Sequence, residues 1–208
     1  MSALSVESSQ EILRRVLQAL AAAQPAAVAV RLCTRVAEGP AGVRGLLNPV
    51  PRPAAAPADE STLPAPFREE GLRTLPALRL GQELQVVISA PVGGHLHLFN
   101  LGCTGDARRM LPRPGEPAPH LEAGRSFLAS PAAGQTWVEK GPVNGFPERV
   151  LAIVTAQARS VPLSSLHPSW SDAAYSRGFG TPVVDSLVSA WPVTEWSWGL
   201  AEAAVETS

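Results

Sequence analysis

The stretch "APVGGHLHLFNLGCTGDARRMLP", residues 90–112, decides which fold this chain can adopt. From residue 94 its side chains alternate with a period of two, which is typical of a β-strand with two different faces. His95 and His97 share one face, and the leucine after each of them lies on the other. Glycines then interrupt the pattern before the short run "RRMLP". The stretch therefore predicts a strand, a hairpin turn that contains Cys103, and a second strand.

Short segments of the same kind recur at intervals of about ten residues, punctuated by Gly and Pro. They are "LRLGQELQVVISA" (78–90), "HLEAGRSFLAS" (120–130), "TWVEKG" (136–141), "ERVLAIVTAQ" (148–157) and "TEWSWGLAEAAVET" (194–207). In the last of these, Trp196, Trp198 and Leu200 alternate with smaller or polar residues, which indicates a closing strand with its bulky residues inward. This spacing is typical of an antiparallel sandwich or barrel.

The N-terminal part differs from the rest. Residues 8–24 predict a helix, because their apolar residues follow a helical spacing and Ser8 with Glu11 fits a capping box. The following "AVAVRLCTRV" (27–36) alternates like a strand and places Cys33 on its more polar face; a continued helix is the alternative. Residues 48–66 are rich in Pro and Ala and are typical of a linker.

We therefore expect a mostly-β protein: an antiparallel β-sandwich with an N-terminal helix and a short C-terminal helix. The expected organisation is an N-terminal helical or mixed segment (1–47), a Pro/Ala-rich linker (48–74) and a sandwich domain (75–208). Thr181 as N-cap with Pro182 at the first helical position predicts the C-terminal helix, over residues 182–191.

Composition excludes some classes of function. The net charge is −1, and no run of basic residues with interleaved aromatics is present, so we expect no nucleic-acid partner. No apolar run approaches 18 residues, and the N-terminus has no secretory pattern. We expect a cytoplasmic protein with no membrane partner.

Residues 80–157 resemble the bacterial family catalogued as domain of unknown function 4384. "LRLGQELQVVISA", "GGHLHLFNLGCTGDARRMLP", "HLEAGRSFLAS" and "GFPERVLAIVTAQ" match its motifs in order. The family tends to have tyrosines where His95 and His97 stand here, and its turn is usually of the Asp-Gly type where this chain has "GCTGD". The resemblance implies a β-sandwich that serves as an accessory module in bacterial signalling or defence, and it supplies no catalytic residues.

Histidine and cysteine side chains are the reactive groups of the opening stretch. Two histidines at i and i+2 of a strand suit a metal ion, but His120, His167 and Cys103 stand at no diagnostic ligand spacing. We therefore interpret His95 and His97 as a packing pair at the family's tyrosine positions. Cys103 falls in a turn with no evident activating base, so a nucleophile is not expected. We predict no catalytic residue, no metal and no cofactor.

The expected interaction surface combines aromatic and basic residues. Trp170 lies in a loop-like segment close to Tyr175 and Arg177, and Arg108 and Arg109 form an isolated basic pair. Aromatic and arginine side chains are enriched at protein interfaces, and an aromatic platform also suits a small ligand.

Three hypotheses for function follow. The leading one is a non-enzymatic interaction or regulatory module that docks on another protein as a complex subunit, such as a protein kinase or caspase-like protease encoded nearby. The second is a sandwich that binds a small ligand, such as a carbohydrate or nucleotide. The third is a hydrolase or metalloprotein that uses His95, His97 and Cys103.

Overall fold

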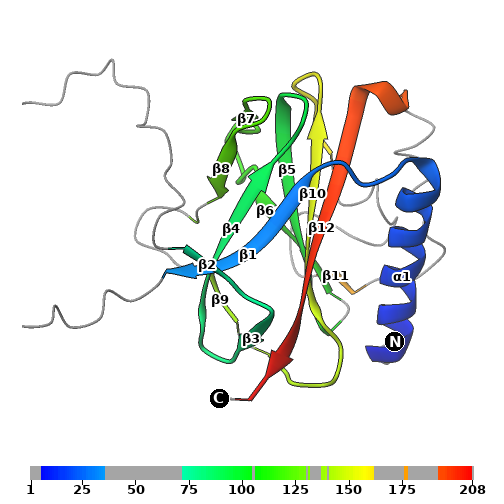
Figure 1. Cartoon of the computed structure of the whole chain (residues 1–208). Coiled ribbons are helices and arrows are strands. Elements are labelled where there is room, and N and C mark those ends of the chain that lie inside the picture. The colour runs from blue at the N-terminus through cyan, green and yellow to red at the C-terminus, as the bar shows by residue number, and fades with distance from the viewer. Residues whose placement is uncertain are drawn as a thin grey trace, which may run out of the picture.

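The computed structural model places two β-sheets face to face and one helix, α1, beside the larger sheet (Figure 1). The structure describes residues 6–35, 72–104, 106–129, 131, 137–139, 141–161, 176–177 and 192–207. Strands dominate and one α-helix lies at the N-terminal end, so the predicted fold class is confirmed. The expected C-terminal helix, 182–191, lies outside the described residues. Among the described residues, no helix combines the length and apolar character needed to cross a bilayer.

Among the described residues, the smaller sheet has five strands. Its order is β2 (Leu72–Thr74), β1 (Ala29–Arg35), β4 (Glu83–Ser89) and β8 (Ser126–Ala129), and β9 (Trp137–Val138) also pairs with β4. All of these pairings are antiparallel.

In the described part of the chain, the larger sheet has seven strands. Its order is β11 (Ser176–Arg177), β6 (Asp106–Leu111), β5 (Gly94–Leu101), β10 (Glu148–Thr155), β12 (Trp196–Glu206) and β3 (Ala77–Arg79), and β7 (His120–Leu121) also pairs with β5. Only the short β12–β3 pairing is parallel among those described. The 3-10 turn η2 (Val193–Glu195) leads into β12.

The N-terminal segment is part of the sandwich. The stretch after the helix forms β1, which pairs with both β4 and β2, so the alternative of a continued helix is wrong. β2 comprises the last three residues of the expected linker. Cys33 lies on the opposite face of β1 from Leu32, as the alternation predicts, but it is buried.

Helix α1 runs from Val6 to Ala23, two residues ahead of its predicted start. Ser8 therefore lies inside the first turn and cannot be the N-cap, which corrects the predicted capping box. Glu11 instead accepts hydrogen bonds from Arg14 and Arg15 on the exposed side of the helix, at 2.7 and 2.8 Å. The apolar face was predicted correctly, because Leu13, Val16 and Leu20 are fully buried.

Two hydrophobic layers result from the alternation in the larger sheet. Odd-numbered residues of β5 and β10, such as Phe99 and Ile153, pack against α1 together with Trp196 and Trp198. Even-numbered residues, such as Leu98, face the smaller sheet and form the core between the sheets. The inward orientation predicted for both tryptophans is confirmed.

One glycine lets the two sheets meet at their edges. The Trp198 carbonyl accepts hydrogen bonds from the amides of Ala27 and Val28, at 2.9 and 3.0 Å, just before β1 begins. A Cβ atom at Gly199 would lie 1.8 Å from the Val28 carbonyl oxygen, so only glycine fits there. Gln24 binds the same strand, donating to the Trp196 carbonyl and accepting from the Trp198 indole, each at 2.9 Å.

We predict that Gly199→Ala destabilises the protein by more than about 3 kcal/mol, because the added methyl group displaces a buried backbone and breaks its hydrogen bonds. Urea unfolding measures the change. Gly81→Ala is the control: Gly81 has a φ of 80° but open space around its Cβ position, so only about 1 kcal/mol of backbone strain is expected. Equal losses in the two variants would contradict this explanation.

Candidate functional site

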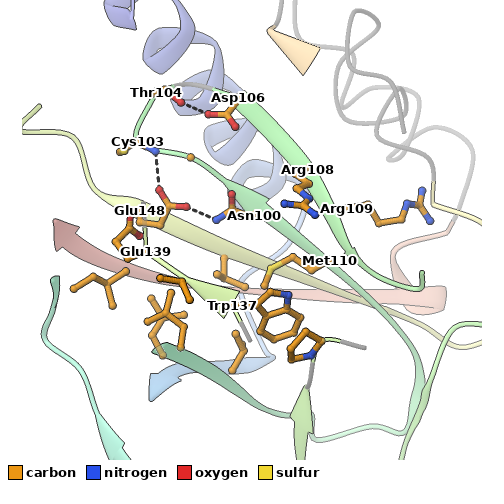
Figure 2. A pocket seen from close by; sticks show the side chains of 18 of the residues that line it. Asn100, Cys103, Thr104, Asp106, Arg108, Arg109, Met110, Trp137, Glu139 and Glu148 are labelled. Carbon is orange, nitrogen blue, oxygen red and sulfur yellow. Dashed lines mark hydrogen bonds between the residues drawn. The ribbon is translucent and has the colours of Figure 1, made fainter. Parts of the chain in front are cut away.

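A pocket of about 690 Å³ opens between the two sheets, at the end where β5 turns into β6. One of its walls is apolar and the end beside the β5–β6 turn is polar (Figure 2). The apolar wall consists of Leu32, Leu78, Leu84, Val86 and Val150. Because this wall continues the core between the sheets, the pocket is an unfilled end of the sandwich interior.

A β-bulge in β6 shapes the open side of the pocket. The register between β5 and β6 shifts at Leu98 and Phe99, so Leu98 pairs with Leu111 while Phe99 pairs with Arg109. The residue left over is Met110, which packs against the core between the sheets and lines the pocket. Trp137 of β9 contributes a half-buried indole to the same pocket (Figure 2).

The polar end is built around the turn that follows β5. Glu148, at the start of β10, accepts hydrogen bonds from the Asn100 side-chain amide and, at 2.8 Å, from the backbone N–H of Cys103. Asp106 accepts from the Thr104 hydroxyl. These bonds hold two carboxyl groups beside the turn (Figure 2).

A third carboxylate, that of Glu139, reaches the same region from the segment after β9. Its Oε1 accepts a hydrogen bond from the Gly141 amide at 2.7 Å, and its backbone pairs with Gln82 and Gly81. All three carboxylates are at most 8 % exposed: Asp106, Glu139 and Glu148.

This end of the pocket disfavours negative charge. Burial, and then the carboxylates of Glu148, Glu139 and Asp106, raise the pKa of the Cys103 thiol to about 12. Burial also raises the pKa of Glu148, which the hydrogen bonds from Asn100 and Cys103 oppose and the other two carboxylates reinforce. Cys103 is therefore a thiol at neutral pH, and it donates weakly to the Pro142 carbonyl at 3.4 Å.

Three arginines line the pocket away from the turn. Arg113 forms an ion pair with Glu116 at 2.9 Å. Arg109 donates to the Val161 carbonyl at 2.6 Å and lies 5.6 Å from the Phe99 ring centroid. Arg108 is exposed.

The structure describes only part of the predicted interaction surface. Arg108 and Arg109 are adjacent on β6 but point to opposite sides of the sheet, since they pair with Asn100 and Phe99. Arg177 pairs with Asp106 through the β11 backbone, and its side chain is not described. Trp170 and Tyr175 lie outside the described residues.

The turn after β5, at the polar end of the pocket, is also hydrogen-bonded to α1. The Gln10 side-chain amide donates to the carbonyls of Gly102 and Cys103, at 3.1 and 2.7 Å. Arg149 donates to Gln10 at 2.8 Å and to Glu202 at 2.6 Å. These bonds join the helix to β10, β12 and the turn at one end of the larger sheet.

The histidines lie away from the pocket. His97 is fully buried on the helix side of β5, and neither ring nitrogen has a hydrogen-bond partner. His95 packs edge-on against the ring of His120, with the centroids 5.2 Å apart. The strand continues four residues beyond His97, about 13 Å at 3.3 Å per residue, before the turn with Cys103 begins. The structure therefore does not bring these histidines together with Cys103.

No group of three metal-ligating side chains occurs among the described residues. Burial, and next the positive charges of Arg109 and His95, lower the pKa of His97 to about 4, although a long contact with the Arg159 backbone opposes the shift. A neutral imidazole packed among apolar side chains agrees with the interpretation of His97 as a packing residue.

The three carboxylates at the polar end of the pocket were not predicted from the sequence. Glu139 and Glu148 stand 33 and 42 residues beyond Asp106, and no motif spacing relates the three. Asn100 was the available signal, because a polar residue that ends an apolar strand often marks a site at the edge of a sheet.

The chain was compared with protein-family models, with curated proteins and with solved structures, and nothing matches in any of the three. The resemblance of residues 80–157 to the bacterial family stays a prediction.

We predict that His97→Leu makes stability less dependent on pH. In the wild type, unfolding restores the His97 pKa from about 4 to about 6.5, so the unfolded chain binds the extra proton and stability falls as the pH falls from 6.5 to 4. The loss is on the order of 3 kcal/mol. Urea unfolding of both proteins at several pH values measures the difference.

The unfolding free energy of His97→Leu should lack the decrease between pH 6.5 and pH 4. Above pH 6.5 this variant should be at least as stable as the wild type, because a buried imidazole without a well-formed hydrogen bond is removed. His120→Gln alters an exposed histidine and should keep the wild-type slope. A wild-type slope in His97→Leu would contradict the prediction.

We also predict that Cys103 is unreactive in the folded protein. A thiol with a pKa of about 12 has almost no thiolate at pH 8, and it is buried. In a Cys33→Ala background, a disulfide reagent should label Cys103 at least 100-fold more slowly in the folded chain than in urea. Rapid labelling under native conditions would mean that the turn opens.

Proposed function

We propose that this protein is a non-enzymatic binding module that takes a small ligand in the pocket between its sheets. The observation that carries the proposal is the pocket itself, of about 690 Å³, with an apolar wall and a polar end. Small-molecule sites typically enclose about 300–1,000 Å³ and combine an apolar lining with a few oriented polar groups. This pocket has both properties.

The contacts around the polar end indicate that it is preformed. Asn100 and the Cys103 amide orient Glu148, Thr104 orients Asp106, and the Gly141 amide orients Glu139. Side chains held in this way lose little freedom when a ligand binds, which favours affinity.

The state of the reactive groups supports a binding role over a catalytic one. A nucleophilic cysteine needs a lowered pKa, and that of Cys103 is raised to about 12. His97 packs on the opposite side of β5 from the pocket, so it cannot serve there as a base.

Among the described residues, the pocket is a better candidate for a binding site than the outer surface. The large apolar side chains exposed on the described chain are Leu80, Val92, Val143 and Val193. Leu80 precedes β4 and Val92 follows it, so they stand at opposite ends of the sandwich. Docking on a protein partner such as a kinase or caspase-like protease, in a signalling or defence setting, stays a prediction that rests on the resemblance.

A variant that fills the pocket tests the proposal. Leu84→Trp adds an indole to the apolar wall, and Val92→Trp adds the same group to the exposed turn after β4. In a thermal-shift screen of chemically diverse metabolites, we expect at least one class to raise the Tm of the wild type and of Val92→Trp by 2 °C or more. Leu84→Trp should show no such shift.

Two outcomes would count against a pocket ligand. One is that no compound shifts the wild type. The other is that the active compound shifts Leu84→Trp as much as the wild type, which would place binding elsewhere.

A further inference from the structure

We propose that the pocket selects a small organic cation, a protonated amine with a hydrocarbon body. This inference rests on the proposed function and names the ligand class of the same pocket. The amino group would bind at the polar end, beside Asp106 or Glu139, and the hydrocarbon body would lie along the apolar wall.

The first observation is that two buried carboxylates each have one oxygen without a partner. Asp106 and Glu139 are 8 % and 5 % exposed. One oxygen of each accepts from Thr104 or from the Gly141 amide, and no group in the described part of the chain donates to the other. Both residues line the pocket, so a ligand there can contact them.

An ionised carboxylate can only accept hydrogen bonds, so a ligand at this end must bring donors. A protonated amine brings up to three N–H donors and a positive charge.

The second observation is the local charge. Three carboxylates lie near the Cys103 turn. They raise the pKa of the Cys103 thiol, as a negative electrostatic potential does. The described ion pairs join none of the three to a cation. Burial of like charges without a counter-charge is unfavourable, and a bound cation would relieve it.

None of the described ion pairs joins an arginine of the pocket to these carboxylates. Arg113 is paired with Glu116, and Arg109 is bound to the Val161 carbonyl and the Phe99 ring. Arg108 is exposed and pairs with Asn100 through the backbone. A metal ion is a poorer candidate than an amine, because the described side chains include no group of three that could hold one.

The third observation is the wall beside the carboxylates. Leucine and valine side chains of four strands, with Met110 and Trp137, form a surface that suits a hydrocarbon chain or ring. The Trp137 indole can also attract a cation through its face. An amphipathic amine matches both the wall and the polar end.

The experiment uses matched probes that differ only in the head group. Hexylamine, 1-hexanol and hexanoate share the same chain and are positive, neutral and negative at pH 7. Binding to the full chain is measured by calorimetry at 50 mM salt. We expect hexylamine to bind at least tenfold more tightly than the other two, and its affinity to fall in 500 mM salt.

Two variants locate the cation. Asp106→Asn and Glu139→Gln remove a charge but keep an oxygen that can accept from Thr104 or the Gly141 amide, so the local structure is retained. Each should weaken hexylamine binding at least tenfold. Glu122→Gln is the control, because Glu122 is an exposed carboxylate paired with Arg125 between β7 and β8.

Several results would overturn this inference and leave the proposed function in place. These are equal binding of hexylamine and hexanol, preference for hexanoate, equal binding to all three variants, or no binding of the probes while another class of compound binds the pocket. If the metabolite screen also finds no ligand, both proposals fail.

Discussion

The arrangement of the two sheets depends on the approach of the Val28 carbonyl to Gly199. The Trp198 carbonyl holds the amides of Ala27 and Val28, so the chain is attached to one sheet immediately before it enters the other. Gln24, the first residue after α1, is bound to the same strand through two further hydrogen bonds. The orientation of the helix and the crossing of β1 over β12 therefore share one anchor, and any side chain at position 199 would separate them.

The pocket lies at the polar end of the space between the two sheets, beside the β5–β6 turn. Near Gly199 the backbones touch, whereas Val86 and Val150 of the described chain border a cavity. The carboxylates at this end are costly to bury, and the fold stabilises each of them with a backbone or side-chain donor. Their position follows from the β5–β6 turn and from the segment after β9.

The fold could be predicted from the sequence because each long strand alternates clearly. The alternation in "HLHLFNL" and "WSWGL" put Leu98, Phe99 and Trp198 on the correct faces. The pocket could not be predicted, because Asp106, Glu139 and Glu148 belong to separate elements that meet only in the folded chain. The start of α1 was misplaced because Ser8 and Glu11 fit a local capping pattern, although Glu11 pairs with Arg14 and Arg15 instead.

The hydrogen bonds of Gln10 have a mechanical consequence. Gln10 lies on the helix, yet it binds the two carbonyls at the turn that forms the end of the pocket. Moving α1 along its axis by a single turn, about 5.4 Å, would break both bonds and the contact with Arg149. The position of α1 is therefore coupled to that of the Cys103 turn, and a displacement of the helix would reach the end of the pocket through these hydrogen bonds.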